Sequence, residues 1–147
     1  MSEKINVVIA DDHTLFREGL AGIISGNEDF EVVGQAGTMQ EAVQLARDLL
    51  PDIILLDIDM PGGGLEAARI VAEECPVTRI VILTSSEEDD HLIRALKIGA
   101  RAYILKGVAA RELIRILRAV SAGESYVPPM LAASLLLGMR EANTQQK

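Results

Sequence analysis

Polar side chains that could do chemistry stand directly after four short apolar runs of the chain. These are Asp11 and Asp12 after residues 5–10, Asp57 after residues 53–56, Thr84 at the end of residues 79–84, and Lys106 after residues 101–105. A short apolar run bounded by turn residues is typical of a strand buried on both faces of a parallel sheet. The carboxyl ends of such strands lie at one edge, where ligands bind in open α/β folds. We therefore expect these side chains to form one site.

Carboxylates gathered in this way repel one another. At about 4 Å and an effective dielectric constant of about 20, each pair of charges costs about 4 kcal/mol. A divalent cation removes that cost, and carboxylate oxygens on a partly open rim suit Mg²⁺, with Mn²⁺ as the alternative metal. Lys106 adds an ammonium and Thr84 a hydroxyl. The set favours phosphoryl transfer to Asp57, because the cation and the ammonium neutralise the transferring oxygens while the carboxylate attacks in line.

Each of these residues also has a purely structural interpretation. The acidic pair could cap a following helix, Thr84 could cap a strand end, and Lys106 could be a solvated charge. A shared site accounts for all of them at once, whereas structural roles require independent coincidences at separate strand ends. His13 and His91, by contrast, are expected to be solvated or capping residues rather than ligands.

Helical periodicity alternates with the apolar runs. Helices are predicted over residues 14–25, 38–50, 65–74, 87–98 and 110–121. The second begins with a capping box, Thr38 and Glu41, and should bury Leu49. A weaker strand near a sheet edge is predicted over residues 30–34. Because links this short require crossover helices, the fold class is α/β, a doubly wound five-stranded parallel sheet with the flavodoxin-like order 2-1-3-4-5.

Composition limits the classes of function. The net charge of −8 argues against direct binding of nucleic acid or of an anionic membrane. No apolar run approaches the roughly 20 residues of a membrane span, and we find no signal peptide. The lone Cys75 cannot form an internal disulfide, which favours a reducing, cytoplasmic location.

The motifs resemble those of the two-component response regulators. The matching residues are Asp11-Asp12, Asp57 followed by Met60-Pro61-Gly62, Thr84-Ser85, and the series Ala95-Leu96, Gly99-Ala100 and Tyr103-Ile104-Leu105-Lys106. Residues 10–13 and 119–127 are most similar to the NarL/FixJ branch, whose members carry a LuxR-type helix-turn-helix after the receiver. The resemblance implies a CheY-like receiver domain over residues 1–127.

The resemblance also implies roles for individual residues. Asp57 would accept a phosphoryl group from a sensor histidine kinase or a small phosphodonor. Lys106 would pair with the phosphoryl oxygens. Thr84 would hydrogen-bond the phosphoryl group and Tyr103 would swing inward behind it, as a two-state switch. The Asp59 side chain and Ser86 would flank the site and tune the lifetime of the phosphorylated state. The implied Mg²⁺ ligands are the side chains of Asp12 and Asp57, the backbone carbonyl of Asp59, and Asp11 through water.

The end of the chain is not needed by a receiver. Residues 128–147 are predicted to form a linker or extra helix, from Met130 to about Glu141, and then a polar tail. The helix either folds back on the domain or contacts another protein, including a second copy in a homodimer. The expected output is transcription through a LuxR-type DNA-binding domain that is absent from this sequence. A stand-alone receiver that acts through protein contacts is the alternative.

Other interpretations remain open. Asp57-Ile58-Asp59 resembles the nucleophile motif of haloacid-dehalogenase-like phosphatases, although their acidic pair follows the nucleophile strand. The other two interpretations are an interaction module that is not phosphorylated and a flavin-binding flavodoxin. On the favoured interpretation the protein is not an enzyme, because it catalyses only its own phosphorylation and dephosphorylation. The family pattern is broken by the loop Gly62-Gly63-Gly64, which is one residue shorter than usual, and by Gly107.

Overall fold

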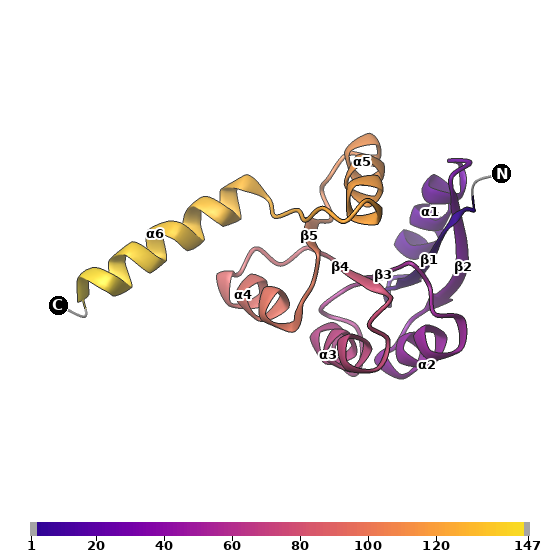
Figure 1. The fold of residues 1–147 in the computed structure, drawn as a ribbon, viewed down its shortest axis with the longest axis horizontal. Coiled ribbons are helices and arrows are strands. Elements are labelled where there is room, and N and C mark those ends of the chain that lie inside the picture. Colours follow the sequence, from indigo (N-terminus) through magenta and orange to yellow (C-terminus); the bar gives the residue numbers. More distant parts are fainter. Residues whose placement is uncertain (1–2, 146–147) are drawn as a thin grey trace.

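The computed structural model describes residues 3–145 and shows one parallel sheet between two layers of helices (Figure 1). The strands are β1 (Ile5–Ala10), β2 (Phe30–Ala36), β3 (Ile53–Leu56), β4 (Arg79–Thr84) and β5 (Ala102–Leu105). They pair in parallel in the order β2-β1-β3-β4-β5. The predicted strand order is confirmed, and β2 lies at the sheet edge as expected.

Helices cover both faces of the sheet (Figure 1). One layer holds α1 (Thr14–Ser25) and α5 (Ala110–Ser121), and the other holds α2 (Met39–Leu49), α3 (Gly64–Glu74) and α4 (Asp89–Ile98). Along β3, Ile53 and Leu55 belong to the core under the first layer, and Ile54 and Leu56 to the core under the second. Because successive strand residues face opposite sides, a strand covered on both faces must be apolar at every position.

Some element boundaries differ from the prediction. The strand β2 continues to Ala36, and α4 begins at Asp89 because Glu88 is still extended. The N-cap bond of the predicted capping box is present, since the Thr38 hydroxyl accepts a hydrogen bond from the Glu41 N–H at 3.2 Å. The Glu41 carboxylate in turn accepts from the Gly37 N–H at 3.2 Å rather than from the Thr38 N–H. The predicted burial of Leu49 is wrong, because this side chain is 43% exposed. It lies at the end of α2, beside the edge strand, where the sheet no longer covers it.

The helix α6 (Pro129–Gln145) projects from the body of the domain (Figure 1). Its first turns are anchored, because Leu131 is buried in the core under α4 and the Ser134 hydroxyl donates to the Asp89 carboxylate at 3.1 Å. The helix continues past the predicted end at Glu141, so the polar tail expected from residue 142 begins as helix; residues 146–147 lie outside the described range.

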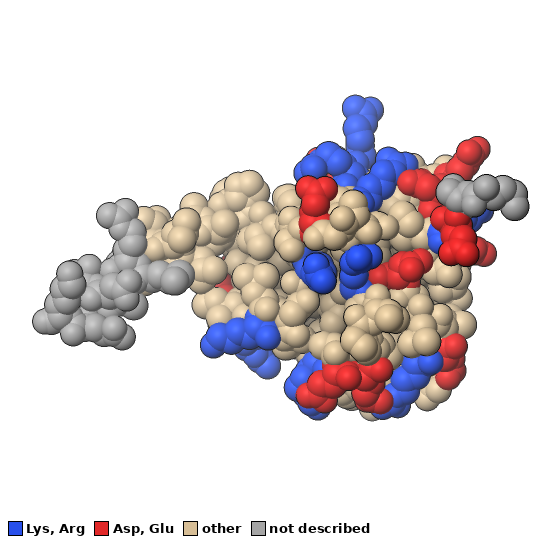
Figure 2. All heavy atoms as spheres, in the orientation of Figure 1, with Lys and Arg blue, Asp and Glu red and all other residues tan. Residues whose placement is uncertain are grey.

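The surface of α6 differs from that of the domain body. Residues 129–138 contain no Asp, Glu, Lys or Arg and form the tan part of the projecting arm in Figure 2. Charged side chains gather instead over α5 and, at the bottom of the view, over α2 and α3.

No helix within residues 3–145 combines the length and apolar character needed to cross a membrane.

Candidate functional site

Backbone hydrogen bonds hold the strand ends in register at one edge of the sheet. The Asp57 N–H donates to the Ala10 carbonyl at 3.0 Å, which places the carboxyl end of β3 beside that of β1. The Lys106 N–H donates to the Thr84 carbonyl at 2.9 Å and joins the ends of β5 and β4 in the same way. Asp11 follows Ala10 directly. The sheet therefore brings the predicted residues to a common rim.

An ammonium and two buried carboxylates form the centre of this rim. Asp57 and Asp11 are only 2% and 3% exposed. The Lys106 Nζ lies 3.0 Å from an Asp57 carboxylate oxygen and 2.8 Å from an Asp11 carboxylate oxygen. Burial alone lowers the pKa of Lys106, but the hydrogen bonds to the two carboxylates outweigh it, so the net pKa is raised and the ammonium stays charged. Asp57 and Lys106 are thus in direct contact, as the sequence predicted.

Asp12 and His13 complete a cluster of groups that could hold a metal ion. One carboxylate oxygen each from Asp11, Asp12 and Asp57 and a ring nitrogen of His13 lie within 4.8 Å of one another. The His13 Nδ1 is 3.0 Å from Asp11 and 3.4 Å from Asp12. His13 does occupy the N-cap of α1, but its side chain makes no capping hydrogen bond. The position of His13 next to the acidic pair Asp11 and Asp12 was the only signal in the sequence that this residue could help to hold a metal ion.

The oxygens of this cluster suit a hard divalent cation, because Mg²⁺ prefers carboxylate and carbonyl ligands and retains waters. Asp12 is exposed and open to solvent, which leaves room for those waters. Asp59 is also exposed, and its N–H donates to the Asp57 carboxylate at 3.4 Å, so the Asp59 backbone lies next to the cluster. The donor set therefore fits the expected metal.

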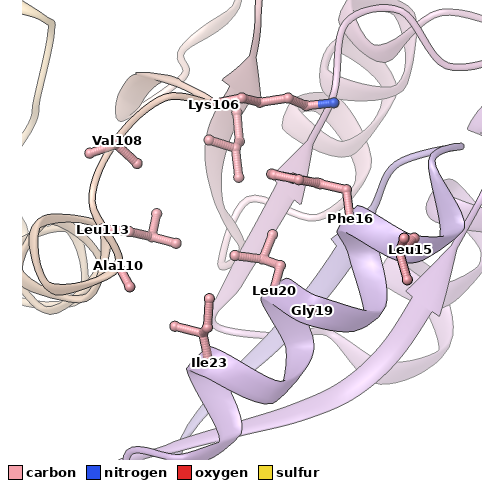
Figure 3. Close-up of a pocket in the computed structure, with 10 residues that line it drawn as sticks. Leu15, Phe16, Gly19, Leu20, Ile23, Lys106, Val108, Ala110 and Leu113 are labelled. Carbon is pink, nitrogen blue, oxygen red and sulfur yellow. The ribbon is translucent and has the colours of Figure 1, made fainter.

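Phe16 is a member of the site that was not predicted from the sequence. The Lys106 Nζ lies 4.7 Å from the centroid of the Phe16 ring, close enough for a cation–π contact. Figure 3 shows the Lys106 side chain extending above this ring, with Leu20 and Ile23 further along α1 and Leu113 across the groove on α5. Helical periodicity can assign a residue to a face of a helix, but only the fold shows which charged group the Phe16 ring faces.

Thr84 and Tyr103 are fully buried next to the loop that follows β4. The Tyr103 hydroxyl donates to the Ser86 carbonyl at 2.9 Å, and the Ser86 N–H donates to the Thr84 hydroxyl at 3.2 Å. Burial raises the pKa of Tyr103. Within the described residues neither side chain forms a hydrogen bond with Asp57, so the two are connected to each other through Ser86.

The glycine loop of residues 62–64 packs directly against the Asp57 backbone. Gly62 and Gly63 have φ of 89° and 92°, a region that side chains rarely adopt. A Cβ added to Gly64 would lie 1.9 Å from the Asp57 carbonyl oxygen. The loop therefore requires glycine and fixes the position of Asp57. Gly107, the other departure from the family pattern, has no heavy atom within 4 Å of its Cβ position.

Known proteins of similar sequence are response regulators. Residues 7–118 match the family model described as "Response regulator receiver domain". Response regulator GacA of Pseudomonas aeruginosa is 40% identical over 134 residues, which cover 90% of this chain and 63% of GacA. Oxygen regulatory protein NreC of Staphylococcus epidermidis is 41% identical over 134 residues, which cover 90% of this chain and 62% of NreC. The chain thus spans less than two thirds of the length of these relatives.

Solved structures of similar fold point to the same family. A LuxR-family two-component response regulator from Aurantimonas sp. SI85-9A1 has a TM-score of 0.86 and 30% identity, and the match covers 93% of this chain and 99% of that one. The signal receiver domain of NarL from Mycobacterium tuberculosis has a TM-score of 0.80 and 34% identity, with 84% and 100% coverage. The phosphatase and flavodoxin interpretations are therefore set aside. The chain belongs to the response regulator receiver domain family, in its LuxR/NarL group, whose domains act as signalling switches rather than metabolic enzymes.

Proposed function

We propose that Asp57 accepts a phosphoryl group and that the added charge switches the conformation of the receiver. The observation that carries this proposal is the contact between the buried Asp57 carboxylate and the partly buried Lys106 ammonium, at 3.0 Å on the carboxyl edge of the sheet. A carboxylate in this position can attack phosphorus, and the adjacent ammonium can neutralise the phosphoryl oxygens.

The reaction transfers a phosphoryl group from a donor to the Asp57 carboxylate. An Asp57 oxygen forms a bond to phosphorus, and the bond from phosphorus to the donor breaks, with its electron pair leaving on the donor. The donor is a phosphohistidine of a sensor kinase or a small phosphodonor such as acetyl phosphate or phosphoramidate. Lys106 then pairs with the phosphoryl oxygens, for which it is already placed between Asp11 and Asp57. The product is an aspartyl phosphate.

The charge of the site explains the need for a metal. Three carboxylates (Asp11, Asp12 and Asp57) and one ammonium (Lys106) sum to a formal charge of −2, which repels an incoming phosphoryl group. The side chains of Asp12 and Asp57 and the carbonyl of Asp59 would hold Mg²⁺ or Mn²⁺, with Asp11 acting through water. When bound, the cation supplies the positive charge that lets the anionic donor approach.

The switch consists of Thr84 and Tyr103. Formation of the aspartyl phosphate places an anion near the end of β4, where the Thr84 hydroxyl can donate to it. Because Ser86 connects Thr84 to Tyr103, the hydrogen bond from Thr84 to the phosphoryl group favours the arrangement of residues 85–88 in which Tyr103 is buried behind it. A local charge thereby biases a two-state element.

The whole protein acts, on this proposal, as a cytoplasmic transcriptional regulator. Its relatives GacA and NreC are regulators that extend beyond the matched region. Residues 1–127 form the receiver, and residues 128–147 form the connection to a LuxR-type DNA-binding domain that lies outside this sequence. The partners are a sensor histidine kinase, DNA through that further domain, and a second copy in a homodimer. The alternative output, protein contacts alone, needs no such domain.

Mass spectrometry tests the acceptor directly. The chain is incubated with Mg²⁺ and acetyl phosphate or phosphoramidate, and the intact mass is expected to increase by one phosphoryl group, with EDTA preventing the increase. Asp57→Asn should abolish it. Asp48→Asn, which changes an exposed carboxylate on α2, is the matched control and should keep it. Modification that persists in Asp57→Asn refutes the assignment, and an unmodified wild type supports the interaction module instead.

A further inference from the structure

Ser86 uses all of its polar groups to join the loop after β4 to its surroundings. Its N–H donates to Thr84 and its carbonyl accepts from Tyr103, as described above. Its hydroxyl oxygen lies 2.6 Å from the Nδ1 of His91, on the first turns of α4, and 3.3 Å from the Glu88 N–H. His91 is therefore connected through one residue to both switch side chains.

The partners of the His91 ring indicate its tautomer. The Ser86 hydroxyl accepts a hydrogen bond from the Glu88 N–H, which leaves the hydroxyl proton free to be donated to the His91 Nδ1. The His91 Nε2 lies 3.5 Å from a Glu88 carboxylate oxygen, which can only accept. A ring with Nδ1 as acceptor and Nε2 as donor satisfies both contacts. The ring is 22% exposed, so its replacement does not leave a deeply buried group without a partner.

We propose that His91 is a positioning residue that holds the loop of residues 85–88, through the Ser86 hydroxyl, in the conformation in which Tyr103 is buried. The proposal rests on the function proposed above and names a regulator of its switch. The sequence alone suggested that His91 is solvated or capping, and α4 has no side-chain capping hydrogen bond. The bond to Ser86 crosses from the helix to the loop and lies outside the phosphoryl-accepting groups.

The hydrogen bond between Ser86 and His91 affects the ratio of the conformations in which Tyr103 is buried and exposed. A hydrogen bond present in only one of two conformations shifts their ratio by its own net free energy, which for a neutral pair corresponds to about fivefold. In this structure the bond coexists with a buried Tyr103, hydrogen-bonded to Ser86. Loss of the bond should therefore raise the population with an exposed Tyr103 about fivefold. This factor applies in full while the exposed population stays minor, so the affinity for a ligand that selects the buried Tyr103 conformation should change little.

A double-mutant cycle tests the connection between His91 and Ser86 in the full chain. The variants are His91→Leu, Ser86→Ala, the double variant, and His91→Asn, whose amide oxygen can replace Nδ1 as acceptor. The ratio of the exposed to the buried Tyr103 conformation is followed by amide NMR signals, with and without Mg²⁺-beryllofluoride. In the free chain each single variant should raise this ratio about fivefold, the double variant should raise it no further than either single one, and His91→Asn should restore the wild-type ratio. Long-range ¹⁵N spectra of the ring should show the Nε2–H tautomer.

A second measurement needs no phosphoryl chemistry. Nitration of Tyr103 by tetranitromethane at fixed pH, with Tyr126 as the internal reference, should be about fivefold faster in His91→Leu than in the wild type. Unchanged nitration, or multiplicative effects in the double variant, would overturn the role of His91. Failure of beryllofluoride to bind the wild type would overturn the proposed function instead, while the nitration result and the ring tautomer would still decide the role of His91.

Discussion

Gly64 is the position at which one methyl group should damage both the fold and the acceptor site. In Gly64→Ala the Cβ would lie 1.9 Å from the Asp57 carbonyl oxygen, 2.6 Å from its carbonyl carbon and 2.8 Å from the Ile58 Cα. All of these are backbone atoms, so no side chain can rotate away. Overpacking of a core typically costs about 1–3 kcal/mol, and the absence of relief puts this variant near about 3 kcal/mol.

The same clash should displace the acceptor. A real Cβ contact is essentially never below 3.0 Å, so relief of the 1.9 Å contact requires a movement of about 1 Å between Gly64 and Asp57. A misplacement of that size in an oriented reaction can reduce the rate about 100-fold. We therefore expect Gly64→Ala to fold with a melting temperature about 10 °C lower and to accept phosphoryl from acetyl phosphate about 100-fold more slowly.

Urea unfolding followed by circular dichroism measures the free energy, and time-resolved mass spectrometry measures the phosphorylation rate. Gly22→Ala is the matched control, because Gly22 lies exposed within α1 with no heavy atom within 4 Å of its Cβ position. That variant should be about 0.5–1 kcal/mol more stable than the wild type and react at the wild-type rate. A Gly64→Ala protein with wild-type stability and rate would refute the packing argument.

Further predictions concern the site, the alkaline range and the C-terminal helix. Lys106→Met should leave beryllofluoride without its ammonium partner and weaken its binding at least about tenfold in a calorimetric titration. The reason is that a hydrogen bond to a charged group contributes about 1.5–3 kcal/mol. Unchanged affinity would exclude Lys106 from contact with the phosphoryl group. Burial raises the pKa of Tyr103 above its ordinary 10.0, so the unfolded chain loses this proton first, and the contribution to stability is present below pH 10.0 and lost as the pH rises through the folded pKa. Tyr103→Phe should therefore flatten the loss of stability above pH 10.0 in urea titrations, and parallel curves would contradict this. Leu131→Ala should lower the free energy of unfolding by about 2–3 kcal/mol, because Leu131 is 7% exposed in the core under α4. Leu136→Ala should change the free energy of unfolding little, because Leu136 is 62% exposed. Equal effects of the two variants would show that α6 is not anchored on the domain.

Apolar runs and the residues that follow them were enough to predict the sheet and the groups on its rim. Apolar runs of strand length alternate with helical periodicity, and this alternation permits few topologies other than a doubly wound sheet. A residue that directly follows a parallel strand must lie at its carboxyl edge, so the order of residues along the chain is enough to assign Asp57, Asp11 and Lys106 to one place. Local rules also placed the capping box at Thr38, because such a motif depends only on neighbours along the chain.

Contacts between elements that are distant in sequence could not be predicted and are visible only in the packed fold. The ring of Phe16 under Lys106, the hydroxyl of Ser86 against His91, and the approach of Gly64 to the Asp57 backbone each join separate elements. Periodicity reports which face of an element is buried, but not which atoms it meets there, since that depends on the relative rotation and distance of packed elements. The exposure of Leu49 has the same cause, because the pattern of α2 cannot show where the sheet beneath it ends.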